Sequence, residues 1–272
     1  MDNKISVLVV GCDKHKNLLD RFFKSFYQFV DPSDVDVYIS LERIAYSYGS
    51  ENITVFNEPD SRLNWCGRVK NCVRQIPAKS ILLMLDDFII ESPVDMDMIR
   101  RLANEIAAHD EIAHFALTTV PMKNASSQKF YDHFYLRAQY GRYKTTLQCG
   151  IWNRDELIDL LNDKESPWQY EIFGNIRSYL SARKYYALDD KANKPIEYND
   201  GWFALQGKLN EVEVKRLEDK LGESFHVEGM VSNEGIVVRN ATPFYRRITG
   251  RLKIIVYTVK YRAICLWRKV HE

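Results

Sequence analysis

The sequence predicts an α/β fold with a mostly parallel, doubly wound, Rossmann-like sheet, and three observations support this prediction. Short apolar runs alternate with segments of helical period through the first half of the chain. The run from Ser80 to Leu85 is apolar without alternation, which is typical of a strand buried on both faces. Two of the runs end abruptly, one at Gly11 and the other at the adjacent carboxylates Asp86 and Asp87.

The first half alternates strands with helices in chain order, which favours parallel strands joined by right-handed crossovers. The expected elements are strand 5–10, helix 17–29, strands 35–40 and 53–56, helix 63–76, strand 81–85, helix 95–109 and strand 113–117. Gly11 ends the first strand without the further glycines of a dinucleotide fingerprint, so classical dinucleotide binding is not expected.

The second half is less regular. Residues 121–145 lack a helical period and predict a long functional loop or small antiparallel additions. A strand with a glycine break follows at 145–152, then a helix at 154–161. Residues 166–169 predict the start of a helix. Ser166 suits the N-cap position, Pro167 suits the first helical position, and Gln169 would complete a capping box with Ser166. A further helix is expected at 211–221.

Charge divides the chain unevenly. It has 38 Lys and Arg against 37 Asp and Glu, and such near neutrality argues against a nucleic-acid partner. From Arg239 onward, however, nine Lys or Arg stand against one acid, so the tail is electrostatically separate. We therefore expect one domain at 1–240, with halves 1–120 and 121–240, and a separate tail at 241–272.

The cysteines and the amino terminus indicate a cytoplasmic chain. Five scattered cysteines without a C-x-x-C pair suit reduced thiols, and Cys12 and Cys149 are expected to be small buried residues. The apolar run at 5–10 is preceded by charged residues, so it predicts a first strand and no secretion signal. No apolar stretch is long enough to span a bilayer.

The pair Asp86–Asp87 is the main candidate for chemistry. Open α/β sheets bind ligands at the carboxyl ends of their strands. Adjacent like charges are unfavourable unless solvent, hydrogen bonds or a cation offset their repulsion, and a divalent metal carrying a diphosphate would do so. The alternative is that one Asp caps the following turn and the other is solvated.

Several motifs together resemble bacterial glycosyltransferases of the A-type (GT-A) fold that build surface polysaccharides. They are Leu85-Asp86-Asp87-Phe88 with Ser92-Pro93-Val94-Asp95, then Gln148 to Trp152, then Glu165 to Glu171. The similarity runs from about residue 5 to 209. It implies a nucleotide-binding first half with a D-x-D-type motif that holds metal and diphosphate, and a second half with the acceptor site and an acidic catalytic base.

The resemblance implies roles in donor binding. Asp87 would be the principal ligand of Mn²⁺ or Mg²⁺, with Asp86 near the ribose or the donor sugar. Leu85 replaces the first Asp of D-x-D, which leaves a metal-free site open. Such a site would need cations, for which Arg62, Arg68 and Lys70 are candidates, although each also suits a solvated helix face. The remaining candidates for donor or metal contact are Gly11 and Lys208, the latter alternatively on a hairpin rim, and His226, alternatively a structural histidine.

The resemblance also places Glu171 as the general base. In an inverting transfer one carboxylate takes the proton of the acceptor hydroxyl, because the donor already carries a good leaving group. Glu171 alternatively serves only the helix dipole or a surface ion pair, and Glu165 is the second choice of base. Trp152 and Trp168 suit an aromatic platform for a sugar, or core filling, and Gln148 suits a hydrogen bond to a sugar.

The tail at 246–270 has the pattern of a basic amphipathic helix. At about 100° per residue, one face collects apolar residues, whereas Ile254, Tyr257 and Ile264 break the pattern. The apolar face comprises Ile248, Leu252, Ile255, Val256, Val259, Ala263, Leu266, Trp267 and Val270. Such a helix suits the anionic surface of the inner face of the cytoplasmic membrane, or docking on the domain or on a second copy in a homodimer.

We therefore expect a peripheral glycosyltransferase that uses a nucleoside-diphosphate sugar and a saccharide or lipid-linked glycan acceptor in lipopolysaccharide, O-antigen or capsule synthesis. Two alternatives stay open. A sugar-nucleotide nucleotidyltransferase would need a glycine-rich Arg/Lys loop after the first strand, which residues 11–14 do not supply. An inactive nucleotide-sugar-binding scaffold is favoured by the missing first Asp.

Overall fold

The computed structural model describes residues 4–49, 52–60, 62–119, 125–130, 133–199, 203–205, 208–222, 224, 231–233 and 244–271. Within them the main sheet has nine strands in the order β3-β2-β1-β4-β8-β5-β9-β7-β6, and β8 and β7 run against the others. The strands are β1 Ile5–Val10, β2 Val35–Leu41, β3 Ile53–Asn57, β4 Ser80–Leu85, β5 Ile112–Thr119, β6 Ala125–Phe130, β7 Phe134–Arg137, β8 Gly150–Asn153 and β9 Lys184–Leu188. The predicted α/β class is confirmed.

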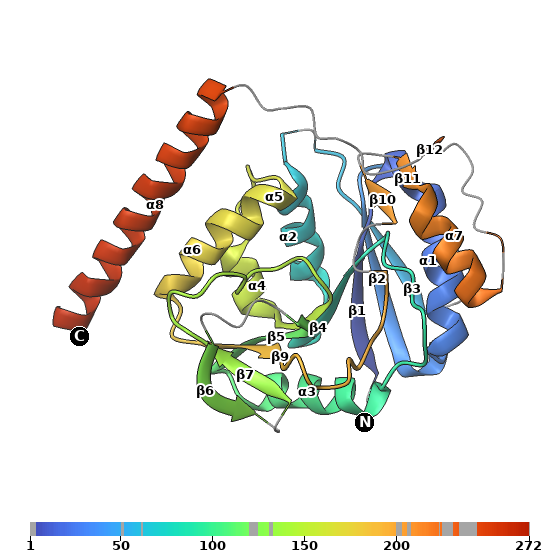
Figure 1. The fold of residues 1–272 in the computed structure, drawn as a ribbon, viewed down its shortest axis with the longest axis horizontal. Helices are drawn as coiled ribbons and strands as arrows, with labels where there is room; N and C mark the ends of the chain where they lie inside the picture. Colours follow the sequence, from blue (N-terminus) through green and yellow to red (C-terminus); the bar gives the residue numbers. More distant parts are fainter. Residues whose placement is uncertain are drawn as a thin grey trace.

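Helices cover both faces of this sheet (Figure 1). Helices α1 (Lys16–Phe29) and α3 (Met96–Ala108) bury their apolar stripes on one face, while α2 (Trp65–Gln75) and α4 (Arg154–Leu160) cover the other. Strand β4 supplies Leu82 and Met84 to one core and Ile81 and Leu83 to the other. This two-sided burial is the reason for its continuous apolar run.

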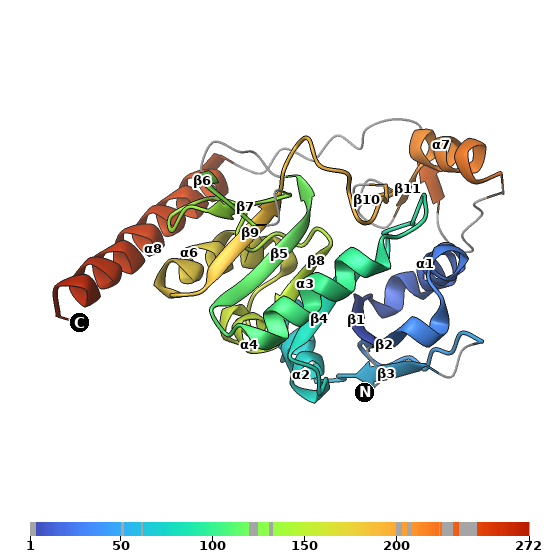
Figure 2. The same cartoon turned by 90° about the horizontal axis from the view of Figure 1, so that it is seen from below.

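A small second sheet lies beside α1 and the segment after β4 (Figures 1 and 2). It comprises β10 (Ala204–Leu205), β11 (Lys208–Asn210) and β12 (Val231–Asn233). Helix α7 (Glu211–Leu221) connects to β11 in the chain and packs beside this sheet. The apolar contact joins Leu18 and Ile89 to Leu217. The buried carboxylate of Glu91 pairs with Arg216 and Lys220 of α7, which fixes α7 next to the segment that follows Asp86 and Asp87.

One expectation for the second half is met and another needs adjustment. The antiparallel additions expected at 121–145 are present as the β6–β7 pair. The strand expected at 145–152 begins only at Gly150, because the preceding residues hydrogen-bond to other elements and form a loop. We call residues 144–149 the bridging loop. Strand β9 and the second sheet's third strand were not predicted.

The segment from 167 to 180 is helical but changes pitch. It runs as α5 (Pro167–Gln169), the π-helical turn η4 (Tyr170–Gly174), α6 (Asn175–Arg177) and the 3₁₀ turn η5 (Ser178–Leu180). Two further 3₁₀ turns, η1 (Asp13–His15) and η2 (Pro32–Asp34), flank α1 and β2. The last helix, α8 (Phe244–His271), lies at the opposite end of the molecule from α1 and α7 (Figure 2). In the described part of the chain, no helix is long and apolar enough to cross a membrane.

Candidate active site

Strands β1 to β4 are parallel and end at one edge of the sheet, as the sequence predicts. The backbone N–H of Gly11 donates to the carbonyl of Ser40 at 3.2 Å, and that of Asp86 donates to Val10, also at 3.2 Å. These bonds hold the residues after β1, β2 and β4 side by side. We call residues 11–13, 42–43, 58–60 and 86–88, which follow these four strands, the carboxyl edge.

The carboxylates of Asp86 and Asp87 are partly enclosed at this edge. One oxygen of each, Oδ2 of Asp86 and Oδ1 of Asp87, is buried and has no hydrogen-bond partner among the described residues. Burial and the charge of Asp87 raise the pKa of Asp86 well above its usual value, and burial also raises the pKa of Asp87. Two buried carboxylate oxygens without hydrogen-bond partners favour a bound cation, which would supply the missing interactions.

Gly11 packs closely against the Asp86 carboxylate. A Cβ at Gly11 would lie 3.1 Å from Oδ2 of Asp86 and 3.3 Å from Cδ2 of Leu41. The adjacent thiol of Cys12 has its pKa raised to about 11 by burial and by the charge of Asp86, so it stays protonated. Cys149 is fully buried, whereas Cys12 is only half-buried. The expectation of a small buried residue is therefore confirmed at Cys149 and met only in part at Cys12.

A pocket of about 410 Å³ opens next to the carboxyl edge. Its lining includes Asp13, Glu42, Trp65 and Arg68. The guanidinium of Arg68 is largely buried and bonds to the carboxylate of Glu42 at 2.9 Å, while its Nη1 has no partner among the described residues. An indole, a carboxylate and a guanidinium offer stacking, acceptor and donor groups, which suit a planar heterocycle with polar edges. The sequence analysis missed Glu42 and Trp65; the position of Glu42 directly after β2 was the available signal.

The other two predicted cations lie elsewhere. Arg62 is exposed and pairs with Asp60 at 2.8 Å. Lys70 donates to the carbonyl of Leu161 at 3.0 Å and therefore ties α2 to the end of α4. Of the three predicted cations, only Arg68 lines the pocket.

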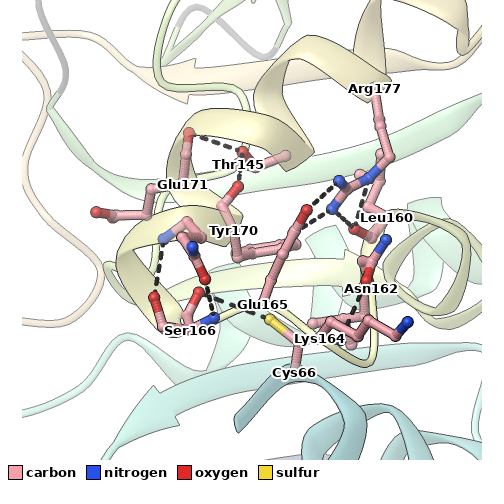
Figure 3. A network of polar contacts seen from close by, with 12 residues as sticks. Cys66, Thr145, Leu160, Asn162, Lys164, Glu165, Ser166, Tyr170, Glu171 and Arg177 are labelled. Carbon is pink, nitrogen blue, oxygen red and sulfur yellow. Dashed lines mark hydrogen bonds and ion pairs between the residues drawn. The ribbon is translucent and has the colours of Figure 1, made fainter. Parts of the chain in front are cut away.

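Glu171 lies in the π-helical turn η4, and the predicted capping box at Ser166 and Gln169 is confirmed. The π pitch displaces backbone carbonyls from their usual partners, and the hydroxyl of Thr145 donates to those of Tyr170 and Glu171 at 3.4 Å (Figure 3). Such turns are frequent at functional sites. The capping box fixes the start of this helical segment and Thr145 bonds to its backbone, so both hold the irregular turn that carries Glu171.

The carboxylate of Glu171 is accessible and has one backbone donor, the N–H of Leu147 at 3.0 Å. Burial by the surrounding protein raises the pKa of Glu171, and the Leu147 bond partly opposes this. Its side chain points away from the Glu165–Arg177 pair (Figure 3). A carboxylate that reaches solvent, has a raised pKa and is oriented by one hydrogen bond can accept a proton.

Glu165 does not suit the role of base. It is buried, and its two oxygens bond to the guanidinium of Arg177 at 2.6 and 2.7 Å (Figure 3). Arg177 also donates to the carbonyl of Leu160. Glu165 is therefore a structural residue that holds the segment before η4 against α4.

The bridging loop links the two carboxylate sites. Leu147 donates to Glu171, and the side-chain oxygen of the next residue, Gln148, accepts from the hydroxyl of Tyr198 at 2.8 Å. The ring of Tyr198 stacks on Phe88, with centroids 4.3 Å apart, and Phe88 directly follows Asp87. A continuous series of contacts thus runs from the predicted base to the paired carboxylates.

Buried residues that the sequence analysis missed hold this arrangement. The ammonium of Lys144 donates to the carbonyls of Gln139 and Ser178, each at 3.1 Å. The side-chain oxygen of Asn199 accepts from the N–H of Ile89 at 2.8 Å. Both lie in segments of irregular sequence, so periodicity gave no signal for them. Tyr198, in the same irregular stretch, was missed for the same reason.

The two predicted tryptophans differ. Trp152 is fully buried in β8 and stacks on His114, with ring centroids 3.8 Å apart, so its predicted sugar-stacking role is wrong. Trp168 is 69% exposed one turn before Glu171 and remains available to a ligand. Lys208 begins β11 and is exposed, which agrees with a position on the rim of the β10–β11 pair. His226 lies outside the described residues.

The described residues contain no group of three or more His, Cys, Asp or Glu side chains that could hold a metal. The two unpartnered oxygens of Asp86 and Asp87 nevertheless fit a hard divalent ion. Mg²⁺ in particular is commonly held by one or two carboxylates together with substrate phosphates and water. Asp86 and Asp87 alone thus provide too few ligands for a divalent ion, and phosphate oxygens of a bound ligand would have to complete its coordination.

Comparison of the sequence with protein-family models and with curated proteins finds no match. Among solved structures, S. aureus TarS 1–349 is 14% identical, with a TM-score of 0.48, over 70% of this chain and 59% of that chain. Mannosyltransferase PcManGT from Pyrobaculum calidifontis, in complex with GDP-Man and Mn²⁺, is 11% identical, with a TM-score of 0.41, over 67% of this chain and 53% of that one.

A UDP-glucose pyrophosphorylase complexed with UDP-glucose is 9% identical, with a TM-score of 0.44, over 73% of this chain and 93% of that one. The chain spans about 59% of the length of the TarS fragment.

Proposed function

We propose that this protein is a glycosyltransferase that moves a sugar from a nucleoside-diphosphate sugar to a saccharide or lipid-linked glycan, with inversion at the anomeric carbon. The observation that carries the proposal is the pairing of two sites. Asp86 and Asp87 present unpartnered oxygens at the carboxyl edge, and a series of contacts through Tyr198 and the bridging loop connects them to Glu171.

In this proposal the carboxyl edge binds the donor. The pocket lined by Glu42, Trp65 and Arg68 receives the nucleoside, and its volume of about 410 Å³ suits a group of that size. Asp87, with Asp86, would hold Mn²⁺ or Mg²⁺ here. Such an ion would help to neutralise the charge that develops on the departing nucleoside diphosphate.

Glu171 acts as the general base. Its carboxylate takes the proton of the acceptor hydroxyl while that oxygen attacks the anomeric carbon and the bond to the diphosphate breaks. We infer inversion because Glu171 is an exposed carboxylate that can serve as a base, whereas Glu165 is committed to Arg177. Trp168, exposed one turn earlier, offers a ring face to the acceptor sugar.

The proposed biological setting is bacterial surface polysaccharide synthesis, such as lipopolysaccharide, O-antigen or capsule. The acceptor is then a growing glycan on a lipid carrier, and the site of action is the inner face of the cytoplasmic membrane. The basic helix α8 is the part of the chain that suits this location, because it has eight Lys and Arg and no acid.

The test measures the product released from UDP-, GDP- and dTDP-sugars with a mixed panel of saccharide and lipid-linked acceptors, with and without Mn²⁺. Release of nucleoside diphosphate with transfer to an acceptor is the expected result. In a parallel incubation with nucleoside triphosphates and sugar phosphates, formation of pyrophosphate would replace the proposal with a nucleotidyltransferase. Donor binding without turnover on every acceptor would indicate a scaffold.

A further inference from the structure

Among the described side chains of helix α8, those that pack on the domain lie on one face of the helix. Ile254, Tyr257 and Tyr261 pack against the cluster formed by Ile176 and Tyr179 of the preceding helical segment. The rings of Phe173 and Tyr257 are 5.0 Å apart, and the guanidinium of Arg262 lies 5.4 Å from the ring centre of Tyr140. This contact explains why Ile254 and Tyr257 broke the apolar pattern seen in the sequence.

The opposite face of α8 is apolar and exposed. At about 100° per residue, the domain-facing positions and the apolar stripe are centred on opposite sides of the helix. The exposed members of the stripe, each 54–65% accessible, are Leu252, Ile255, Val256, Val259 and Trp267. Five large apolar side chains in one row exceed the scattered exposure of an ordinary surface and indicate an interaction face.

Positive charge flanks this stripe. Lys253 and Lys260 are exposed along one side and Arg262 along the other. Residues 244–271 include eight Lys and Arg and no Asp or Glu. Apolar residues bordered by cations, with a Trp among them, are the pattern of a helix that lies in the interface of an anionic bilayer.

We propose that the outer face of α8 binds an anionic membrane leaflet, with the helix axis parallel to the surface and its inner face holding the domain. A second copy of the chain fits less well, because a symmetric contact through α8 would bring two strongly basic helices together without an acid to offset them. Anionic headgroups supply the complementary charge, and the acyl region receives the apolar stripe.

Docking through α8 would also orient the site, a step that rests on the proposed function. Phe173, which contacts Tyr257, lies two residues after Glu171 in the same π-helical turn. A membrane-bound α8 therefore brings the predicted base close to the leaflet that would present a lipid-linked acceptor. The attachment itself needs no catalytic activity and is measured separately.

The test is co-sedimentation of the full chain with vesicles of phosphatidylcholine alone or with about 30% phosphatidylglycerol. Wild type is expected to bind the anionic vesicles and to dissociate at high salt. Val256→Asp should lower the partition coefficient at least about tenfold, and the double variant Lys253→Glu/Lys260→Glu about 20-fold. Matched controls on α7 are Val212→Asp, at an equally exposed apolar residue, and Lys215→Glu; neither should change binding.

Circular dichroism first establishes that each variant is folded. Equal binding to both vesicle types, no binding to either, or equal losses in the α7 controls would overturn the proposal. So would a wild-type dimer in solution that Val256→Asp converts to monomer. The proposed function fails separately, in the donor assay with a soluble acceptor, where Val256→Asp should retain wild-type turnover.

Discussion

The two halves of the site are built differently. In the first half, regular parallel strands carry Asp86 and Asp87 to a shared edge, where one buried oxygen of each carboxylate has no hydrogen-bond partner among the described residues. In the second half, Glu171 lies in an irregular π-helical turn and has a specific donor from the bridging loop. The first half thus has regular backbone geometry but leaves two carboxylate oxygens without partners. The second half has irregular backbone geometry, but its carboxylate has a hydrogen-bond donor from the protein.

This difference assigns separate tasks to the two halves. An electrostatically incomplete edge gains its missing interactions from a ligand, so changes there should alter binding. A carboxylate held by one backbone N–H needs no ligand for its position, so changes there should alter the chemical step. Substitutions that separate binding from turnover therefore test the comparison directly.

The largest effect is expected at Glu171. Glu171→Gln keeps the hydrogen bond to Leu147 and removes the proton acceptor, so kcat should fall by about 10²- to 10⁴-fold while donor affinity stays within twofold. Steady-state kinetics and calorimetry measure the two quantities. Glu211→Gln, at an exposed carboxylate of α7, is the control and should leave both unchanged. Substantial residual turnover in Glu171→Gln would remove this residue from the mechanism.

The internal pairing of the second half is tested at Glu165. Glu165→Gln leaves the buried guanidinium of Arg177 without its counter-charge and should lower the free energy of unfolding by about 3–5 kcal/mol. Denaturant titration measures the change. The double variant Glu165→Leu/Arg177→Met removes both charges and should recover much of the loss. A single variant as stable as wild type would mean that the pair is not effectively buried.

The junction of the two halves is tested at Gly150, in the strand between β4 and β5. A Cβ there would lie 2.3 Å from Nε2 of His114 and 2.9 Å from the carbonyl oxygen of Phe115. Gly150→Ala should therefore destabilise the fold by about 1–3 kcal/mol. Gly49→Ala, where a Cβ would meet no atom within 4 Å, is the matched control. Equal melting temperatures for the two variants would contradict this packing.

The smallest effect is a shift in the pH profile. Burial raises the pKa of Glu171, and a general base must be ionised, so kcat should rise with pH through an acid limb displaced above the usual glutamate value of about 4.3. The pH dependence of kcat at saturating donor and acceptor measures it. A limb at or below the ordinary value would indicate that the surrounding protein does not raise the pKa of the catalytic carboxylate.

The sequence predicted the first half of the fold better than the second, for a physical reason. Strand β1 matches its predicted bounds, and α1 and β4 differ by one residue, because two-sided burial and amphipathic periods are local signals. Strand β9 and the bridging loop depend on long-range pairing, which leaves no periodic pattern.

The same distinction applies to the site. The carboxylate pair and the capping box before Glu171 are visible as adjacent residues in the sequence. Two other contacts could not be read from neighbouring residues. Trp152 stacks on His114, 38 positions away, and Tyr198 bonds to Gln148, 50 positions away. Helix α8 has one feature of each kind. Its apolar stripe was predicted from the local period of the sequence, whereas the side that contacts the domain was not predicted.

The central claim is that the carboxyl edge binds a nucleoside-diphosphate sugar through Asp87 and a divalent ion. Isothermal titration calorimetry of wild type and Asp87→Asn with UDP-, GDP- and dTDP-sugars, with and without Mn²⁺, tests it most directly. We expect wild type to bind at least one donor, more tightly with Mn²⁺, and Asp87→Asn to lose that dependence. Absence of donor binding by wild type, or unchanged Mn²⁺-dependent binding by Asp87→Asn, would contradict the account.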